Sequence, residues 1–407
     1  MAEAEENVVP KGLPFPGRRP ALHPDDLDPE KFFPVGDRPL QPVSILEPQS
    51  IAVTICVALD NYLFTGYEDG SVMEWCPKSS LMPLKSFKGH LGAITTLKVT
   101  ESHVYTGATD CCARVFNRRS ARVLRSFNNG HTAAVLDILA HDQAIFTAGG
   151  DDTILEWDAK KGRACSSLQG HSGPVNVLRL VGKHTLVSGS WDGSIRTWSV
   201  ENFEQRRYAT APEFVHCRHF LRAHNDRLID IFVFSPTLVV SFGCDGVLVR
   251  YLRWNSGIAL HSATAIQHAE MLPDKCRMIG VSKDGELFLW DVIANTLLVS
   301  RKIAHSPLRF LGYLECDELL YVCGITVRGE VKTMDISQLS TTTSQGNRFI
   351  SHALNDPIVS AIRVGSLFAT MTCSECRLWK IEDFCFVRDS VTGKNSGISI
   401  EIDVLDV

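Results

Sequence analysis

Two groups of residues in this 407-residue chain combine a hydroxyl, an imidazole and a carboxylate, the set that activates the nucleophile of serine hydrolases. The groups are His171, Ser188 and Asp192, and His131, Thr147 and Asp151. Both follow the order histidine, hydroxyl, aspartate at nearly the same spacing. No active site is made in multiple copies around one repeated framework. We therefore interpret both groups as structural, and we expect no enzyme activity.

An aromatic residue closes each of these groups and recurs along the chain with a period near forty residues. The closing residues of successive units are Trp75, Phe116, Trp157, Trp198, Tyr251, Trp290, the non-aromatic Met334 and Trp379. The first three intervals are 41 residues each. A period near forty is typical of the blades of a β-propeller.

Each unit supplies three short apolar, β-branched segments that are separated by turn residues. In the cleanest unit these segments are Val175 to Leu180, His184 to Ser188 and Ser194 to Trp198. Asp192-Gly193 lies between the last two, and Asp-Gly is the strongest short-range signal for a hairpin. The pattern predicts strands that hold the polar residues at or near the turns.

The repeats resemble those of the WD (tryptophan-aspartate) repeat family, from about Val43 to Ser390. Gly89-His90, Gly130-His131 and Gly170-His171 each open a unit. In that family the imidazole donates to the aspartate and meets a hydroxyl, which in turn meets the tryptophan indole. The resemblance implies two complete structural tetrads, formed by His131, Thr147, Asp151 and Trp157, and by His171, Ser188, Asp192 and Trp198.

The tetrad is incomplete in other units, but apolar strand faces dominate packing and should still form blades. Phe116 and Tyr251 replace tryptophan, and Gly280 and Gly324 occupy the hydroxyl position. We expect an all-β propeller with eight blades; the alternative is a seven-bladed ring plus an extra terminal unit. Either Pro42 to Leu46 or Phe384 to Ser390 could supply the outer strand that closes the ring.

The chain divides into three parts by composition. Residues 1–42 hold nine of the eighteen prolines, so we expect a disordered N-terminal arm. Within it, Leu13 to Pro20 could act as a polyproline ligand. Residues 43–390 form the propeller and residues 391–407 a C-terminal tail. Between Glu201 and Leu221 the chain contains an insertion, which we expect to enlarge a loop on the face that carries the Gly-His turns.

Charge and cysteine usage narrow the class of protein further. The net charge is −5, which disfavours nucleic acid as a partner. No stretch approaches eighteen apolar residues, so we expect no membrane span. Thirteen cysteines without a disulfide pattern indicate reduced thiols, hence the cytoplasm, with the nucleus as the alternative. Cys373 and Cys376 have CxxC spacing but no second pair, so we expect no metal and no cofactor.

The resemblance implies binding rather than catalysis. We expect a scaffold or adaptor, a monomer within a larger complex, whose partners are proteins or peptides. They would bind the face made by the Gly-His turns and the aspartate turns, which we call the top face. Trp191 is the expected anchor, because aromatic residues dominate interface hot spots. The other candidates on this face are Tyr67, Glu68, Thr109 and Lys283.

The sequence leaves two alternative functions open. One is a substrate-recognition subunit of a ubiquitin ligase, since some related propellers dock an adaptor through Trp-Asp-x-Arg. Here the nearest sequences are Trp157-Asp158-Ala159-Lys160, with lysine in place of arginine, and Phe116-Asn117-Arg118-Arg119, which lacks both the tryptophan and the aspartate. The other is an RNA-associated propeller, which the acidic balance disfavours.

Overall fold

The computed structural model describes residues 42, 44–46, 51–201, 203–208, 212–254, 257–260, 264–304, 308–316, 319–326, 330–336, 349–353, 358–372 and 376–381. All described elements belong to the compact unit Val35–Val407. The predicted arm (apart from Pro42), the predicted tail and the turn that contains Cys373 lie outside the described residues. No described helix is long and apolar enough to cross a membrane.

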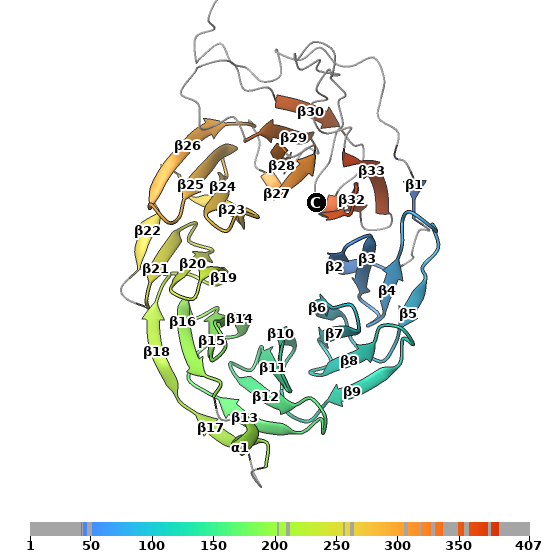
Figure 1. The fold of residues 1–407 in the computed structure, drawn as a ribbon, viewed down its shortest axis with the longest axis vertical. Coiled ribbons are helices and arrows are strands. Elements are labelled where there is room, and N and C mark those ends of the chain that lie inside the picture. Colours follow the sequence, from blue (N-terminus) through green and yellow to red (C-terminus); the bar gives the residue numbers. More distant parts are fainter. Residues whose placement is uncertain are drawn as a thin grey trace, which may run out of the picture. The chain divides into compact units, whose positions relative to one another are not determined.

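Among the described residues the strands form eight sheets, which follow one another around a ring (Figure 1). We number the sheets 1 to 8 in the order of their innermost strands. Sheet 1 contains β2 (Val53–Leu59), β3 (Tyr62–Tyr67), β4 (Val72–Trp75) and β5 (Lys85–Phe87), and sheet 2 contains β6 (Ile94–Val99), β7 (His103–Ala108), β8 (Ala113–Asn117) and β9 (Val123–Phe127). Sheet 3 contains β10 (Val135–His141), β11 (Ala144–Gly149), β12 (Ile154–Asp158), β13 (Ala164–Leu168) and β17 (Glu213–Val215). Sheet 4 contains β14 (Val175–Val181), β15 (Thr185–Ser190), β16 (Ser194–Ser199) and β18 (Cys217–Arg222).

Sheets 5 to 8 continue the same pattern. Sheet 5 contains β19 (Leu228–Ser235), β20 (Leu238–Gly243), β21 (Leu248–Leu252) and β22 (Ile258–Leu260), and sheet 6 contains β23 (Ile266–Met271), β24 (Arg277–Ser282), β25 (Glu286–Asp291) and β26 (Thr296–Lys302). Sheet 7 contains β27 (Leu308–Cys316), β28 (Leu319–Thr326), β29 (Glu330–Asp335) and β30 (Phe349–Ala353). Sheet 8 contains β31 (Ile358–Val364), β32 (Leu367–Thr372), β33 (Cys376–Lys380) and β1 (Ser44–Ile45). The predicted all-β propeller is confirmed, and the helix α1 (Phe203–Arg206) is a four-residue exception.

Sheets 1, 2, 5, 6 and 7 each consist of consecutive strands, and β17 of sheet 3 lies in the chain between β16 and β18 of sheet 4. Sheet 8 is completed from the N-terminal side. Its outer strand β1 pairs antiparallel with β33, Ser44 opposite Leu378. Of the two candidate closing segments, the one at Pro42 to Leu46 therefore supplies the strand, and Phe384 to Ser390 lies outside the described residues. The terminal unit is part of the ring, because its Leu378 shares a buried apolar cluster with Leu63 and Trp75 of sheet 1.

Apolar residues between neighbouring sheets form the core. The cluster between sheets 3 and 4 includes Phe146, Leu178 and Trp198, all fully buried. The closing aromatic residues therefore pack between sheets and stabilise the ring by burial. Gly193 makes the hairpin turn possible: its φ is +75°, and a Cβ there would lie 2.5 Å from the His224 carbonyl oxygen.

The insertion after β16 lies on the face opposite to the one expected. β16 begins at the Asp192 turn on the top face, so its end, where Val200 N–H bonds the His184 carbonyl, lies on the other face. Strand direction alternates at every turn, and the insertion follows the strand that leads away from the top face. There α1 crosses to sheet 3, and β17 pairs in parallel with β13 as a fifth strand.

Candidate partner-binding face

The tetrad of sheet 4 is a continuous chain of hydrogen bonds beneath the top face. Trp198 Nε1 donates to Ser188 Oγ at 2.9 Å, Ser188 Oγ lies 2.8 Å from His171 Nε2, and His171 Nδ1 lies 3.0 Å from Asp192 Oδ2. The backbone N–H of Ser172 also donates to that carboxylate. The chain of hydrogen bonds therefore ties β15, β16 and the turn between them to the turn that precedes β14.

A neutral imidazole satisfies every link of this chain. Burial lowers the pKa of His171, opposed only in part by Asp192. Burial acts to raise the pKa of Asp192, but hydrogen bonds from His171, Ser194 and Ser172 outweigh it and hold the pKa well below its usual range. With its proton on Nδ1, His171 donates to Asp192 and accepts from Ser188, which accepts from Trp198.

The same four-residue chain of hydrogen bonds is present in sheet 3, and sheet 2 contains it without the tryptophan. His131 lies 3.0 Å from Asp151 and 2.7 Å from Thr147, to which Trp157 donates at 2.8 Å. In sheet 2 the histidine, hydroxyl and aspartate meet without an indole, because Phe116 closes the unit. The predicted tetrads are thus brought together, and their hydroxyls are fully buried.

Tyr67 lies inside sheet 1 and not on the top face, which corrects its place among the binding candidates. It is 2% exposed, and its hydroxyl oxygen accepts a 2.9 Å hydrogen bond from Thr65 Oγ1. Thr65 in turn accepts from the Trp75 indole at 2.8 Å. Burial raises the pKa of Tyr67 to about 12. The tyrosine hydroxyl occupies the place that a histidine takes in the complete tetrads.

Trp191 is an exposed aromatic residue on a rigid turn of the top face. Its side chain is 43% exposed, and its backbone N–H donates to the Pro174 carbonyl at 2.9 Å. The Arg227 guanidinium lies 5.2 Å from the centroid of the ring, a cation–π contact from the next sheet. The remaining candidates, Glu68, Thr109 and Lys283, are exposed on the corresponding turns of sheets 1, 2 and 6.

Two further residues of this face, Leu91 and Arg227, were not predicted from the sequence. Leu91 follows His90 in the turn before β6 and is 92% exposed, the most exposed large apolar residue described. The equivalent positions carry Thr132, Ser172 and Asn225, so the apolar exception was visible in the sequence. Arg227 gave no such signal, because its contact with Trp191 joins two different sheets.

A relay of ion pairs that was not predicted from the sequence joins the innermost strands of neighbouring sheets. Lys98 Nζ lies 2.7 Å from Asp137, and Arg179 bridges Asp137 at 3.4 Å and Asp230 at 2.5 Å. These residues come from the innermost strands β6, β10, β14 and β19. Burial and the negative charge of Asp230 raise the pKa of Glu270, on β23, to about 7.

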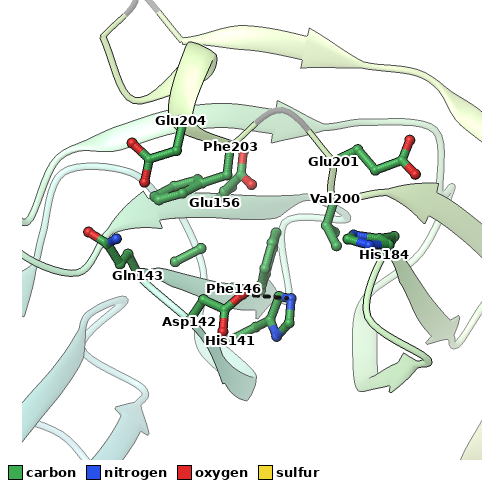
Figure 2. A pocket seen from close by; sticks show the side chains of 11 residues that line it. His141, Asp142, Gln143, Phe146, Glu156, His184, Val200, Glu201, Phe203 and Glu204 are labelled. Carbon is green, nitrogen blue, oxygen red and sulfur yellow. Dashed lines mark ion pairs between the residues drawn. The ribbon is translucent and has the colours of Figure 1, made fainter.

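On the face opposite the top face a pocket of about 770 Å³ lies between sheets 3 and 4, partly covered by the insertion (Figure 2). Phe146, Phe203 and Val200 form apolar parts of its lining, and His141 and His184 face it. The Glu156 carboxylate is already bound by Arg206. Within the described residues no group of three or more His, Cys, Asp or Glu could hold a metal ion.

The fold is a β-propeller, and its hydrogen-bonded tetrads are those that the resemblance to WD repeats implies. A family model described as "WD domain, G-beta repeat" matches residues 81–117 and 162–199, the regions of sheets 2 and 4. Propellers of this kind are generally non-enzymatic and typically serve as interaction scaffolds that bind other proteins.

Several curated proteins are similar to parts of the chain. Ribosome biogenesis protein ytm1 of Aspergillus oryzae is 26% identical over 74% of this chain and 61% of its own length. The Periodic tryptophan protein 2 homolog of Caenorhabditis elegans is 30% identical over 33% of this chain and 15% of its own. A Danio rerio p21-activated protein kinase-interacting protein 1-like is 27% identical over 36% and 40%. The chain thus spans less than two thirds of each relative's length.

A solved structure supports the fold alone. The crystal structure of the computationally designed Ika8 protein superposes with a TM-score of 0.66 at 19% identity. The match covers 84% of this chain and 99% of the designed one.

Proposed function

We propose that this protein is a non-catalytic scaffold that binds a protein or peptide on its top face, with Trp191 as the anchor. The observation that carries the proposal is the exposed indole of Trp191, held on a turn and flanked by Arg227. Aromatic and arginine side chains are enriched among interface hot spots. Leu91 adds apolar area, and Glu68, Thr109 and Lys283 provide a polar rim.

The burial of the tetrads supports a non-catalytic role. Ser188 and Thr147 are the hydroxyls of the two triad-like groups, and both are 0% exposed. Each hydroxyl also accepts a hydrogen bond from a tryptophan indole. A substrate carbonyl therefore has no path to either oxygen, and the groups act as structural supports for the turns.

The ubiquitin-ligase alternative loses its docking residue. Asp158, within the sequence nearest to Trp-Asp-x-Arg, is 0% exposed and is bound by the insertion residue Arg207 at 3.2 Å. An adaptor that reads this carboxylate could not reach it. The second candidate function is a role in the assembly of a ribonucleoprotein, which is favoured by the similarity to a protein named for ribosome biogenesis.

The test compares partner capture and titration for two variants. Partners would be purified with the wild-type chain, identified by mass spectrometry and titrated individually. We expect Trp191→Ala to weaken binding by about 2 kcal/mol, roughly 30-fold, while the melting temperature stays the same. Phe220→Ala is the matched control, because Phe220 is another exposed aromatic under an arginine, Arg196, but lies on the outer strand β18.

Equal affinity of Trp191→Ala and wild type for every partner would remove the top-face anchor from the proposal. We place the protein in the cytoplasm, as a monomer within a larger complex, with the nucleus as the alternative. Fluorescence imaging of the tagged chain and sedimentation of the purified chain test these two points.

A further inference from the structure

A cluster of exposed cations lies on the outer side of sheets 2 and 3, at the end away from the top face. Arg119, Arg122 and Arg125 come from the turn after β8 and from β9, and Lys160 and Lys161 from the turn between β12 and β13. All five side chains are exposed. We call these five residues and Tyr208 the cationic patch.

Direct contacts join the two turns into one surface. Arg125 Nε donates to the Lys160 carbonyl at 2.6 Å, and a terminal nitrogen of Arg125 donates to the Leu124 carbonyl at 2.6 Å. These bonds use backbone oxygens, so the charge of Arg125 is not neutralised. Lys161 Nζ lies 4.8 Å from the centroid of the Tyr208 ring, which extends the surface onto the insertion.

The neighbouring carboxylates are occupied by other cations. Glu74 binds Lys85 and Arg118, and Asp158 binds Arg207. Within the part of the chain that the structure describes, none of the five cations of the patch forms an ion pair. Two exposed carboxylates lie nearby, Glu101 in the adjacent turn and Glu204, which shares Arg207 with Asp158, so the five cations of the patch still outnumber them. The patch is therefore strongly positive although the whole chain carries −5.

Tyr208 gives the patch a second chemical property. Its ring is 68% exposed, and the Arg207 guanidinium lies 5.5 Å from its centroid. Arg207 is itself fixed by Asp158 and Gln143, so the ring rests on an ordered base. An exposed aromatic ring beside several unpaired cations is the arrangement on which single-stranded nucleic acids bind, with bases stacked on the ring and phosphates on the cations.

We propose that the cationic patch binds single-stranded nucleic acid, with Tyr208 as a stacking platform for a base. An acidic protein segment would use the charges but has no need of the exposed ring. The patch is separate from the top face and does not include Trp191, so this binding is independent of the scaffold function proposed above.

The magnitude of the salt dependence follows from the number of phosphate contacts. Five contacts to a single strand give a slope of about −3.5 for log K against log salt, so affinity should fall about 100-fold between 50 and 200 mM salt. The Lys160→Gln/Lys161→Gln variant should reduce the slope to about −2. Tyr208→Ala should weaken binding about tenfold with the slope unchanged, and Tyr208→Phe should retain binding because the ring remains.

The experiment uses the full chain and fluorescence anisotropy with labelled 15-nucleotide oligouridine and oligodeoxythymidine. The matched control is Lys183→Gln/Lys302→Gln, which removes two exposed lysines outside the patch. Trp191→Ala serves as a second control and should bind like wild type. All substituted residues are exposed, and a thermal melt of each variant checks that it folds. Binding of both oligonucleotides supports recognition by backbone and stacking, and binding of oligouridine alone supports an added contact to the 2′-hydroxyl.

Several results would overturn the proposal. One is no binding of either oligonucleotide at 50 mM salt. Another is equal loss of affinity in the control double variant. A third is equal competition by polyglutamate together with wild-type affinity of Tyr208→Ala, which would assign the patch to acidic proteins. Binding to anionic vesicles without binding to oligonucleotides would assign it to a membrane surface.

Discussion

Arg206 donates hydrogen bonds to both carboxylate oxygens of Glu156, at 2.6 and 2.7 Å, and both side chains are buried. Glu156 belongs to β12 of sheet 3, whereas Arg206 ends the helix α1 in the insertion between β16 and β18 of sheet 4. A bidentate pair of this kind fixes geometry as well as charge. The pair therefore holds the insertion against the neighbouring sheet and places Tyr208 beside Lys161.

Removing one partner of this pair should destabilise the protein strongly. Arg206→Ala leaves the buried Glu156 carboxylate without its cation, which costs about 3 to 5 kcal/mol. Urea denaturation measures the change. Glu204→Gln is the control, because Glu204 pairs with Arg207 from an exposed position and should change stability by less than about 1 kcal/mol. Similar denaturation midpoints for Arg206→Ala and wild type would contradict the expectation.

Breaking the tetrad of sheet 4 should destabilise the protein less than Arg206→Ala does. Asp192→Ala removes the acceptor of His171 Nδ1 and of the Ser172 N–H, and a buried unpaired donor costs about 1 to 3 kcal/mol. Thermal and urea melts measure the loss. Lys283→Ala changes an exposed residue of an equivalent turn and should melt like wild type; an unchanged melt for Asp192→Ala would argue against a structural tetrad.

The hydroxyl of Tyr67 should matter for stability and not for binding. Tyr67→Phe removes the acceptor of the Thr65 hydroxyl in the core of sheet 1, at a cost of about 0.5 to 1.5 kcal/mol. Partner affinity should stay at the wild-type value, since the residue is buried. A loss of affinity without a loss of stability would return Tyr67 to the binding face.

Acidification should destabilise the protein through its buried histidines. Burial lowers the pKa of His90, His171 and His224. Below about pH 6.5 the unfolded chain takes up protons that the folded chain does not, so stability is complete above this pH and decreases below it. Each histidine contributes up to about 1.4 kcal/mol per pH unit. Urea midpoints between pH 8 and pH 5 measure the slope, and a flat profile would count against neutral imidazoles in the tetrads.

Glu270 has the opposite effect on stability to that of the histidines as the pH falls, because its folded-state pKa is raised to about 7. Its contribution is present at low pH and is lost as the pH rises through 7. Glu270→Gln should therefore steepen the decrease in stability between pH 7 and pH 5. A variant profile parallel to that of wild type would show that Glu270 titrates normally.

Patterns within one repeat were enough to predict the hairpins and the tetrads from the sequence alone. The residues of each tetrad lie within one unit of about forty positions, so their spacing predicted both the hairpins and the hydrogen-bonded sets around Trp157 and Trp198. The tertiary structure alone decided contacts between units. These contacts include the pairing of Ser44 with Leu378 and the hydrogen bond between Arg125 and Lys160. The tertiary structure also decided that the insertion lies on the face opposite the top face. Periodicity describes how a strand alternates and where it turns, but it holds no information on which distant segment packs beside it, because that depends on the shape and charge of the assembled ring.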